Sequence, residues 1–185
     1  MRFIGKQSIQ FALSLLFFVS ASLSTTSLAA TSPGATSDSA ASDSAVTDRM
    51  ALKLETVIDL RVLQKQAGSS NLPVLLLLTA EECDYCEAIR SHYLEPMIRS
   101  GKYDSSLLFR QLYIDEFHYL RNHRGELVGG DQIALKYDVE VTPTILFIDA
   151  SGKELADRIV GLSGADYFDR TLDTHISQAQ SNFQK

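Results

Sequence analysis

Cys83 and Cys86 are the only cysteines in the 185-residue chain, and two residues separate them. The thiolate is the reactive form of cysteine, and a pair at this spacing can close and open a disulfide during exchange with another protein. A disulfide across so short a loop adds little stability, because the entropy it removes from the unfolded chain grows with loop length. The spacing therefore favours redox chemistry over a purely structural cross-link.

The elements on either side of the pair would position it for this chemistry. Residues 72–79 form an apolar run whose length predicts a strand buried on both faces, and residues 87–98 carry apolar side chains at helical intervals. The cysteines thus lie where a central strand ends and a helix begins. Free N–H groups and the helix dipole there lower the pKa of the first thiol. Cys83 is the predicted nucleophile, and Cys86 would resolve the mixed disulfide.

The remaining pattern completes an α/β domain with a mixed sheet of four to five strands. Strands are expected at 107–114, 144–148 and 154–160, and helices at 48–67 (capped near Thr47 or Asp48), at 131–137 (capped by Asp131) and at 163–176. Residues 154–160 would pair with the preceding strand as a hairpin. The last helix would use Tyr167, Phe168, Leu172 and Ile176 as its inner face. Polar residues 116–130 are expected to form an excursion.

The N-terminus has the three-part pattern of a secretory signal peptide. Arg2 and Lys6 precede a mostly apolar stretch over 9–19, and small residues lead to a cleavage site near Ala29. The apolar stretch is short for a membrane anchor, the alternative reading. We therefore expect a signal peptide over 1–29, a disordered linker of small and polar residues over 30–47, and the folded domain over 48–185.

Composition and motif spacing exclude several classes of function. The net charge is −6 and no basic block is present, so nucleic-acid binding is not expected. Cys83, Cys86 and His92 lack the second ligand pair of a four-ligand zinc site. Haem attachment needs His where this chain has Glu87. Neither a metal nor another cofactor is expected.

Two stretches, 74–86 and 134–155, resemble the thioredoxin superfamily in residue types and in order. The first contains the strand and the Cys-Asp-Tyr-Cys motif, and the second contains Val-Thr-Pro-Thr before an apolar strand. The resemblance extends over 72–176 and is greatest to periplasmic thioredoxin-like proteins, either those of sulfur-oxidation systems or the disulfide-reducing branch of the Dsb proteins. It implies a thioredoxin-like fold with an extra N-terminal helix, and a location in the periplasm.

The resemblance also implies roles for two residues beyond the cysteines. Pro143 would follow a cis peptide bond, face the cysteine pair and keep metal ions away from it. The backbone of Thr142 would pair with an extended substrate peptide. Apart from the resemblance, the position of Tyr85 inside the motif predicts that it is partly exposed, and it would either shape substrate contact or act as a passive spacer.

This chain departs from cytosolic thioredoxins near the motif. Glu82 stands where those proteins have Trp, and Leu77 stands where they bury an aspartate used in proton transfer. Glu81, Glu82 or Glu87 are candidate replacements, although solvated acids at a helix start are the simpler interpretation. Together with Asp84, these acids disfavour a thiolate and predict a reducing couple. A reductant in an oxidising compartment needs a membrane electron donor of the DsbD type.

Three functions fit these features: a thiol:disulfide oxidoreductase that reduces protein disulfides, a dedicated electron carrier for one pathway such as sulfur oxidation or cytochrome maturation, and a non-catalytic binding module. A partner-docking loop is a further hypothesis for the locally basic stretch of His118, Arg121, His123 and Arg124, with an ordinary exposed loop as the alternative.

Overall fold

The structure, a computed structural model, describes residues 52–162 and 164–184. The expected signal peptide, the linker and the first residues of the expected helix over 48–67 lie outside this range. Within the described part of the chain, no helix combines the length and the apolar character needed to cross a membrane.

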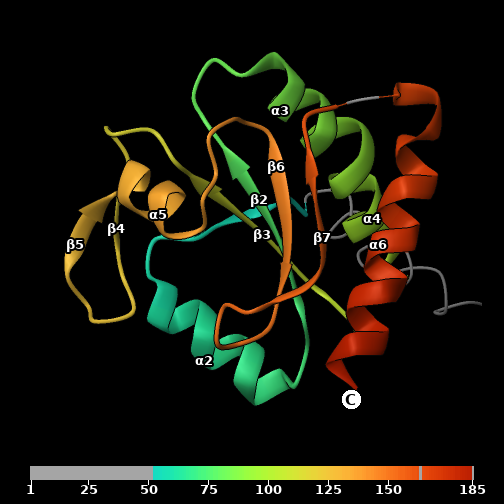
Figure 1. The fold of residues 1–185 in the computed structure, drawn as a ribbon. Helices are drawn as coiled ribbons and strands as arrows, with labels where there is room; N and C mark the ends of the chain where they lie inside the picture. The colour runs from blue at the N-terminus through green and yellow to red at the C-terminus, as the bar shows by residue number, and fades with distance from the viewer. Residues whose placement is uncertain (1–51, 163, 185) are drawn as a thin grey trace, which may run out of the picture. The chain divides into compact units, whose positions relative to one another are not determined.

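A five-stranded mixed sheet forms the centre of the domain (Figure 1). In spatial order its strands are β1 (Glu55–Thr56), β3 (Leu108–Tyr113), β2 (Val74–Thr79), β6 (Thr144–Ile148) and β7 (Glu154–Val160). The β1–β3 and β3–β2 pairs are parallel, whereas β2–β6 and β6–β7 are antiparallel. The predicted mixed sheet and its closing hairpin are confirmed.

Strand β2 is central because its side chains are apolar on both faces. All six residues are buried. Leu75 and Leu77 contribute to the core on one face of the sheet, and Leu76 and Leu78 to the core on the other. Such a strand is stable only between two helical layers, so β2 fixes the point at which the chain emerges beside the cysteines.

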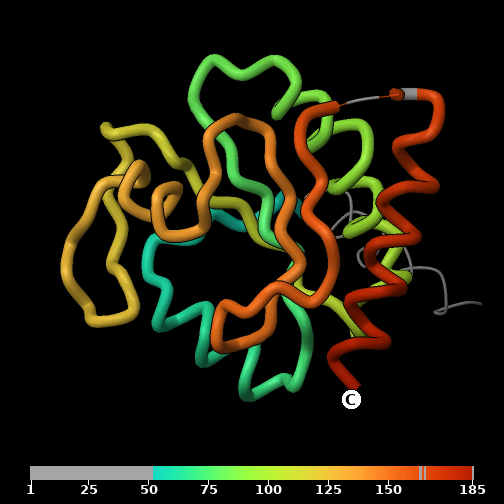
Figure 2. Tube along the Cα trace, viewed as in Figure 1, coloured from blue at the N-terminus to red at the C-terminus, as the bar shows by residue number. Residues whose placement is uncertain are grey.

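Helices cover both faces of the sheet. One face packs against α2 (Leu60–Ser70) and α5 (Gly130–Lys136). The other packs against α6 (Phe168–Phe183) and a segment made of α3 (Asp84–Ile89), the π-helical turn η1 (Arg90–Leu94) and α4 (Glu95–Ser100). Figure 2 follows the same path as a tube, with the C-terminal end of α6 far from α3.

The predicted N-terminal helix is wrong in its first half. Residues 55–56 form β1 against β3, and the helix begins only at Leu60. Asp59 ends the extended stretch, because its carboxylate accepts the backbone N–H of Arg61 at 2.9 Å as an N-cap. The buried Leu54 and Val57 fit this strand as well as they fit a helical spacing.

The excursion at 116–130 folds into a two-stranded hairpin of β4 (Tyr119–Arg121) and β5 (Leu127–Gly129). The helix after it begins at Gly130 with Gly129 as its cap, so the prediction that Asp131 caps it is wrong; Asp131 lies in the first turn. Gly129 has the extended backbone of a cap residue.

The closing helix was predicted too early in the chain. A 3₁₀ turn, η2 (Ala165–Tyr167), precedes α6, which runs to Phe183. Phe168, Leu172 and Ile176 are buried as expected, but Tyr167 is 60% exposed. Tyr167 lies outside the inner face because α6 begins one residue after it, and Arg170 stacks on its ring instead.

Candidate redox site

The cysteine pair lies at the end of β2, on the loop that leads into α3. Cys83 and Cys86 form a disulfide with an S–S distance of 2.06 Å and a Cα–Cα distance of 5.2 Å. Cys83 is the N-cap of α3, as the strand-then-helix pattern predicted. The helix begins at Asp84, three residues before the predicted start, so both cysteines belong to its first turn.

The two sulfur atoms differ in access and in hydrogen bonding. Cys83 is half-buried, whereas Cys86 is only 1% exposed. The backbone N–H of Cys86 donates to Cys83 Sγ at 3.3 Å. Hydrogen bonds to sulfur favour its charged form. A thiol or a disulfide of another protein can therefore reach Cys83, and Cys86 lies behind it.

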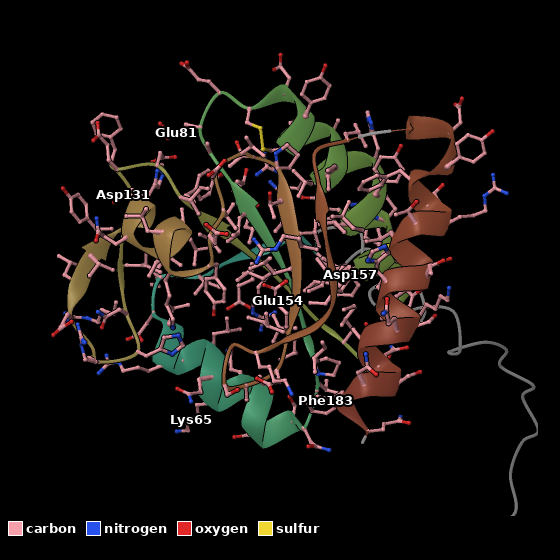
Figure 3. The ribbon with its side chains drawn as sticks, viewed as in Figure 1. Lys65, Glu81, Asp131, Glu154, Asp157 and Phe183 are labelled. Carbon is pink, nitrogen blue, oxygen red and sulfur yellow. A yellow bond between two sulfur atoms is a disulfide. The ribbon has the colours of Figure 1, made fainter. Side chains whose placement is uncertain are left out.

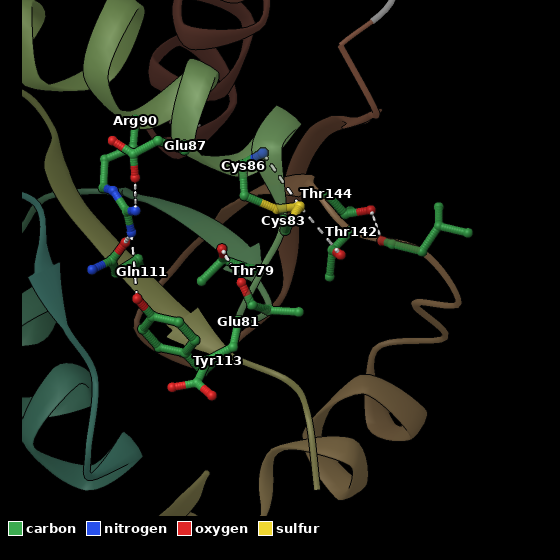
Figure 4. Close-up of a disulfide and its surroundings, with 12 residues drawn as sticks. Thr79, Glu81, Cys83, Cys86, Glu87, Arg90, Gln111, Tyr113, Thr142 and Thr144 are labelled. Atoms are coloured by element: carbon green, nitrogen blue, oxygen red, sulfur yellow. Dashed lines mark hydrogen bonds and ion pairs between the residues drawn. A yellow bond between two sulfur atoms is a disulfide. The ribbon is translucent and has the colours of Figure 1, made fainter. Parts of the chain in front are cut away.

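The loop before β6 approaches the same sulfur from the opposite side. The hydroxyl of Thr142 donates to Cys83 Sγ at 3.7 Å (Figure 4), and the Thr142–Pro143 peptide is cis. Pro143 is buried next to this contact. Tyr85 and Val141 are 66% and 53% exposed. Thus Cys83, Thr142 and Pro143 lie together, while Tyr85 lies on the exposed first turn of α3.

An arginine that sequence reasoning missed neutralises one of the acids near the pair. Arg90, one helical turn after Cys86, forms an ion pair with Glu87 and donates to Gln111 Oε1 at 3.1 Å and to the Tyr113 hydroxyl at 3.4 Å (Figure 4). Burial lowers the pKa of Arg90, but the hydrogen bonds to Glu87 and Tyr113 outweigh burial and raise it.

Asp115 is a second residue that sequence reasoning missed. It follows β3, which runs parallel to β2, and its carboxylate accepts the backbone N–H of Glu81 at 3.2 Å. The signal was available, because the carboxyl ends of neighbouring parallel strands meet at one edge of a sheet. Burial raises the pKa of Asp115, but the hydrogen bonds from His118 and from the Glu81 amide outweigh it and lower the pKa.

The locally basic stretch does not form one patch. His118 lies beside the redox loop, bonded to Asp115 and 3.7 Å from Glu81 Oε1. His123 lies instead against α2 and Tyr137. Figure 3 places Glu81 beside the disulfide, with Lys65 on α2 and Phe183 on α6 at the other end of the domain. The two histidines therefore lie in different surroundings, and partner docking by this stretch stays a prediction.

The other departures from cytosolic thioredoxins hold in three dimensions. Leu77 is fully buried within the apolar core beneath α3. Glu81 and Glu82 are exposed, and Glu82 has a positive φ of 54° in the turn before Cys83. Tyr113 is half-buried, and its ring stacks on the ring of His118. In the described residues, no three His, Cys, Asp or Glu side chains are grouped to bind a metal ion.

The sequence profile of the thioredoxin-like domain matches residues 60–176, more than half of the chain. The chain belongs to this family. No curated protein matches it. Among solved structures, the chain is similar to thioredoxin h from poplar, which is 18% identical, with 66% of this chain and 96% of that chain covered and a TM-score of 0.47. A thioredoxin from Malassezia sympodialis is also 18% identical, with 70% and 95% covered and a TM-score of 0.49. Mitochondrial thioredoxin 3 from Saccharomyces cerevisiae is 17% identical, with 72% and 97% covered and a TM-score of 0.47.

Proposed function

We propose that this thioredoxin-like protein is a thiol:disulfide oxidoreductase that reduces disulfides in other proteins. The observation that carries the proposal is the asymmetry of the pair. Cys83 is accessible and accepts a hydrogen bond at its sulfur, whereas Cys86 is buried one helical turn behind it. This is the arrangement that an attacking thiolate and a resolving thiol require.

In the reaction, the reduced protein would donate two electrons to the substrate. The Cys83 thiolate attacks one sulfur of a substrate disulfide, so that a Cys83–substrate bond forms and the substrate S–S bond breaks. The released substrate thiolate takes a proton. The Cys86 thiol then loses its proton and attacks Cys83, releasing the second substrate thiolate and restoring the Cys83–Cys86 disulfide. Thr142, Pro143 and Tyr85 border Cys83 and would contact the substrate chain.

Reduction is the direction that the charges around the motif support. Glu81, Glu82 and Asp84 are exposed around Cys83, and negative neighbours oppose a strongly stabilised thiolate. A strong oxidant depends on such a thiolate. The signal-peptide pattern of residues 1–29 supports export to the periplasm, where a membrane donor of the DsbD type would return the protein to its dithiol form.

A dedicated carrier for one pathway is the second candidate, and one observation favours it. General thioredoxins bury an acid at the position of Leu77, whereas this chain buries an apolar side chain there. Such a carrier, in sulfur oxidation or cytochrome maturation, would perform the same exchange on a single partner.

Insulin reduction by dithiothreitol tests the proposal. We expect the wild-type protein to accelerate precipitation of insulin, and Cys83→Ser to abolish the acceleration because it removes the attacking sulfur. Ser91→Ala, in the same helical segment, is the matched control. Equal rates for wild type and Cys83→Ser would contradict the proposal.

Trapping separates the two candidates. Cys86→Ala leaves Cys83 able to form a mixed disulfide that nothing resolves. Captured partners are then identified on non-reducing gels from periplasmic extract. Many captured proteins support a general reductase, and a single one supports a dedicated carrier. Capture that persists in the Cys83→Ser, Cys86→Ala double variant would contradict both.

A further inference from the structure

A polar cluster beside the redox loop has no role in the exchange described above. It consists of Glu81 on the β2–α3 loop, Tyr113 at the end of β3, and Asp115 and His118 on the β3–β4 loop. We call it the His118 cluster. Its members come from segments more than thirty residues apart in the chain, yet they meet at the edge of the sheet around Glu81, two residues before Cys83.

The cluster holds the segment that presents Cys83. The Asp115 carboxylate accepts the Glu81 N–H at 3.2 Å, two residues before Cys83. His118 Nδ1 is bonded to the other oxygen of the same carboxylate, and the ring stacks on Tyr113 with centroids 4.4 Å apart and planes at 18°. The Gly130 N–H donates to the His118 carbonyl at 2.8 Å, which ties the His118 backbone to α5.

The charges that face His118 are mostly negative. Asp115 contacts one ring nitrogen, and the Glu81 carboxylate lies 3.7 Å from the other. The facing Tyr113 hydroxyl accepts a hydrogen bond from Arg90, and Asp131 lies in the first turn of the adjoining helix α5. Histidine is the side chain whose charge ordinarily changes between pH 5 and 8. A charged His118 would therefore offset the negative field just before Cys83.

We propose that His118, held by Asp115, is a positioning residue for Cys83: it fixes the β2–α3 loop through Asp115, and a proton on its ring adds a positive charge that favours the Cys83 thiolate. The inference rests on the proposed function, since it concerns the reactivity of the attacking thiol. It adds a histidine on a distant loop that regulates how readily that thiol ionises as the pH of the compartment changes.

The test is the rate at which iodoacetamide alkylates Cys83 in the fully reduced full-length chain, measured from pH 5.5 to 9.5. Below the titration of the thiol, this rate is proportional to the thiolate fraction. We expect His118→Gln to react about threefold more slowly than wild type at pH 6, the effect of one charge acting through largely aqueous surroundings. At pH 9.5 the two rates should coincide, because a histidine side chain carries no charge at that pH.

Three further measurements keep the test specific. His118→Lys retains a positive charge and should restore the pH 6 rate. His92→Gln, which removes an exposed histidine from η1, should leave the rate unchanged. The difference between wild type and His118→Gln should shrink in 1 M salt, where charges are screened beyond about 3 Å. Circular dichroism verifies that each variant is folded.

Several outcomes would overturn the inference. One is an equal rate for wild type and His118→Gln at pH 6. Another is a loss of equal size at pH 6 and pH 9.5, which indicates a role in folding alone. A change of the same size in His92→Gln would indicate a general charge effect. A failure of the proposed function would be seen in a different assay. The wild-type protein would then not accelerate insulin reduction, whatever the alkylation rates are.

Discussion

Replacing Gly130 by Ala should destabilise the domain by displacing the backbone beside the redox loop. Gly130 begins α5 directly against the β3–β4 connection. A Cβ at this position would lie 2.7 Å from Ile114 Cα and 2.9 Å from the Asp115 carbonyl oxygen, and closer still to the Tyr113 carbonyl oxygen. All three neighbours are backbone atoms, so no side chain can rotate to make room.

The cost follows from these contacts. Forcing an extra methyl group into filled space costs about 1–3 kcal/mol, and the upper end applies because strand-end backbone must shift. The gain from replacing glycine in a helix is at most about 1 kcal/mol and recovers only part of this. We expect a net loss of about 2 kcal/mol. With a urea m-value of about 2 kcal/mol/M, the unfolding midpoint should fall by about 1 M.

Gly68→Ala is the matched control. Gly68 lies inside α2, where the nearest heavy atom to a new Cβ is Ala150 Cβ at 3.9 Å, an ordinary contact. The free energy of unfolding of Gly68→Ala should rise by about 0.5–1 kcal/mol, and its urea midpoint should rise with it. A Gly130→Ala protein within 0.5 kcal/mol of wild type would refute the steric argument, and so would a Gly68→Ala protein that loses as much.

Two other changes test the packing and the electrostatics of the domain. Burial lowers the pKa of His123, so the folded state binds fewer protons than the unfolded state. The contribution of neutral His123 to the free energy of unfolding is therefore complete above the unfolded-state pKa of about 6.5, and it declines as the pH falls below that value. In His123→Leu, the free energy of unfolding measured in urea should decrease less between pH 7 and pH 5 than it does in wild type. An equal decrease in both proteins would exclude His123 as its cause. Phe168→Ala removes a ring that is 1% exposed and should cost about 3–5 kcal/mol, whereas Tyr167→Ala, at a 60% exposed neighbour, should cost less than about 1 kcal/mol. Similar losses for both would contradict the assigned start of α6.

The sequence was most informative where one physical requirement dominated. The unbroken apolar run of β2 could be stable only between two layers, so it predicted the central strand, although the cysteine helix after it begins three residues earlier than predicted. Strands β6 and β7 were separated by a turn whose Asp149 carboxylate accepts the backbone N–H groups of Ser151 and Lys153, and their hairpin was predicted correctly.

Errors arose where two structures fit one pattern. Leu54 and Val57 suit a helical face, but pairing of the short β1 with β3 decides that region, and a two-residue strand leaves no periodicity to detect. Tyr167 is apolar enough for a helix face, yet the helix begins just after it. The hairpin of β4 and β5 is only three residues on each side, too short for a strand pattern.

The chemical pair was predictable, whereas its surroundings were only partly so. Spacing alone assigned Cys83 and Cys86, and family resemblance placed Thr142 and Pro143 beside them. Sequence reasoning treated the nearby acids as one negative field. It could not show that Arg90 reaches Gln111 and Tyr113 or that His118 reaches Glu81, because those contacts join segments that only the folded sheet brings together.

The reduction potential of the Cys83–Cys86 couple tests the central claim most directly. It is obtained by equilibrating the full-length chain with glutathione or dithiothreitol buffers and counting free thiols by mass after alkylation. The account predicts a reducing couple, near the potential of about −270 mV that is typical of thioredoxin. A value near the −120 mV of a strong oxidase would contradict it.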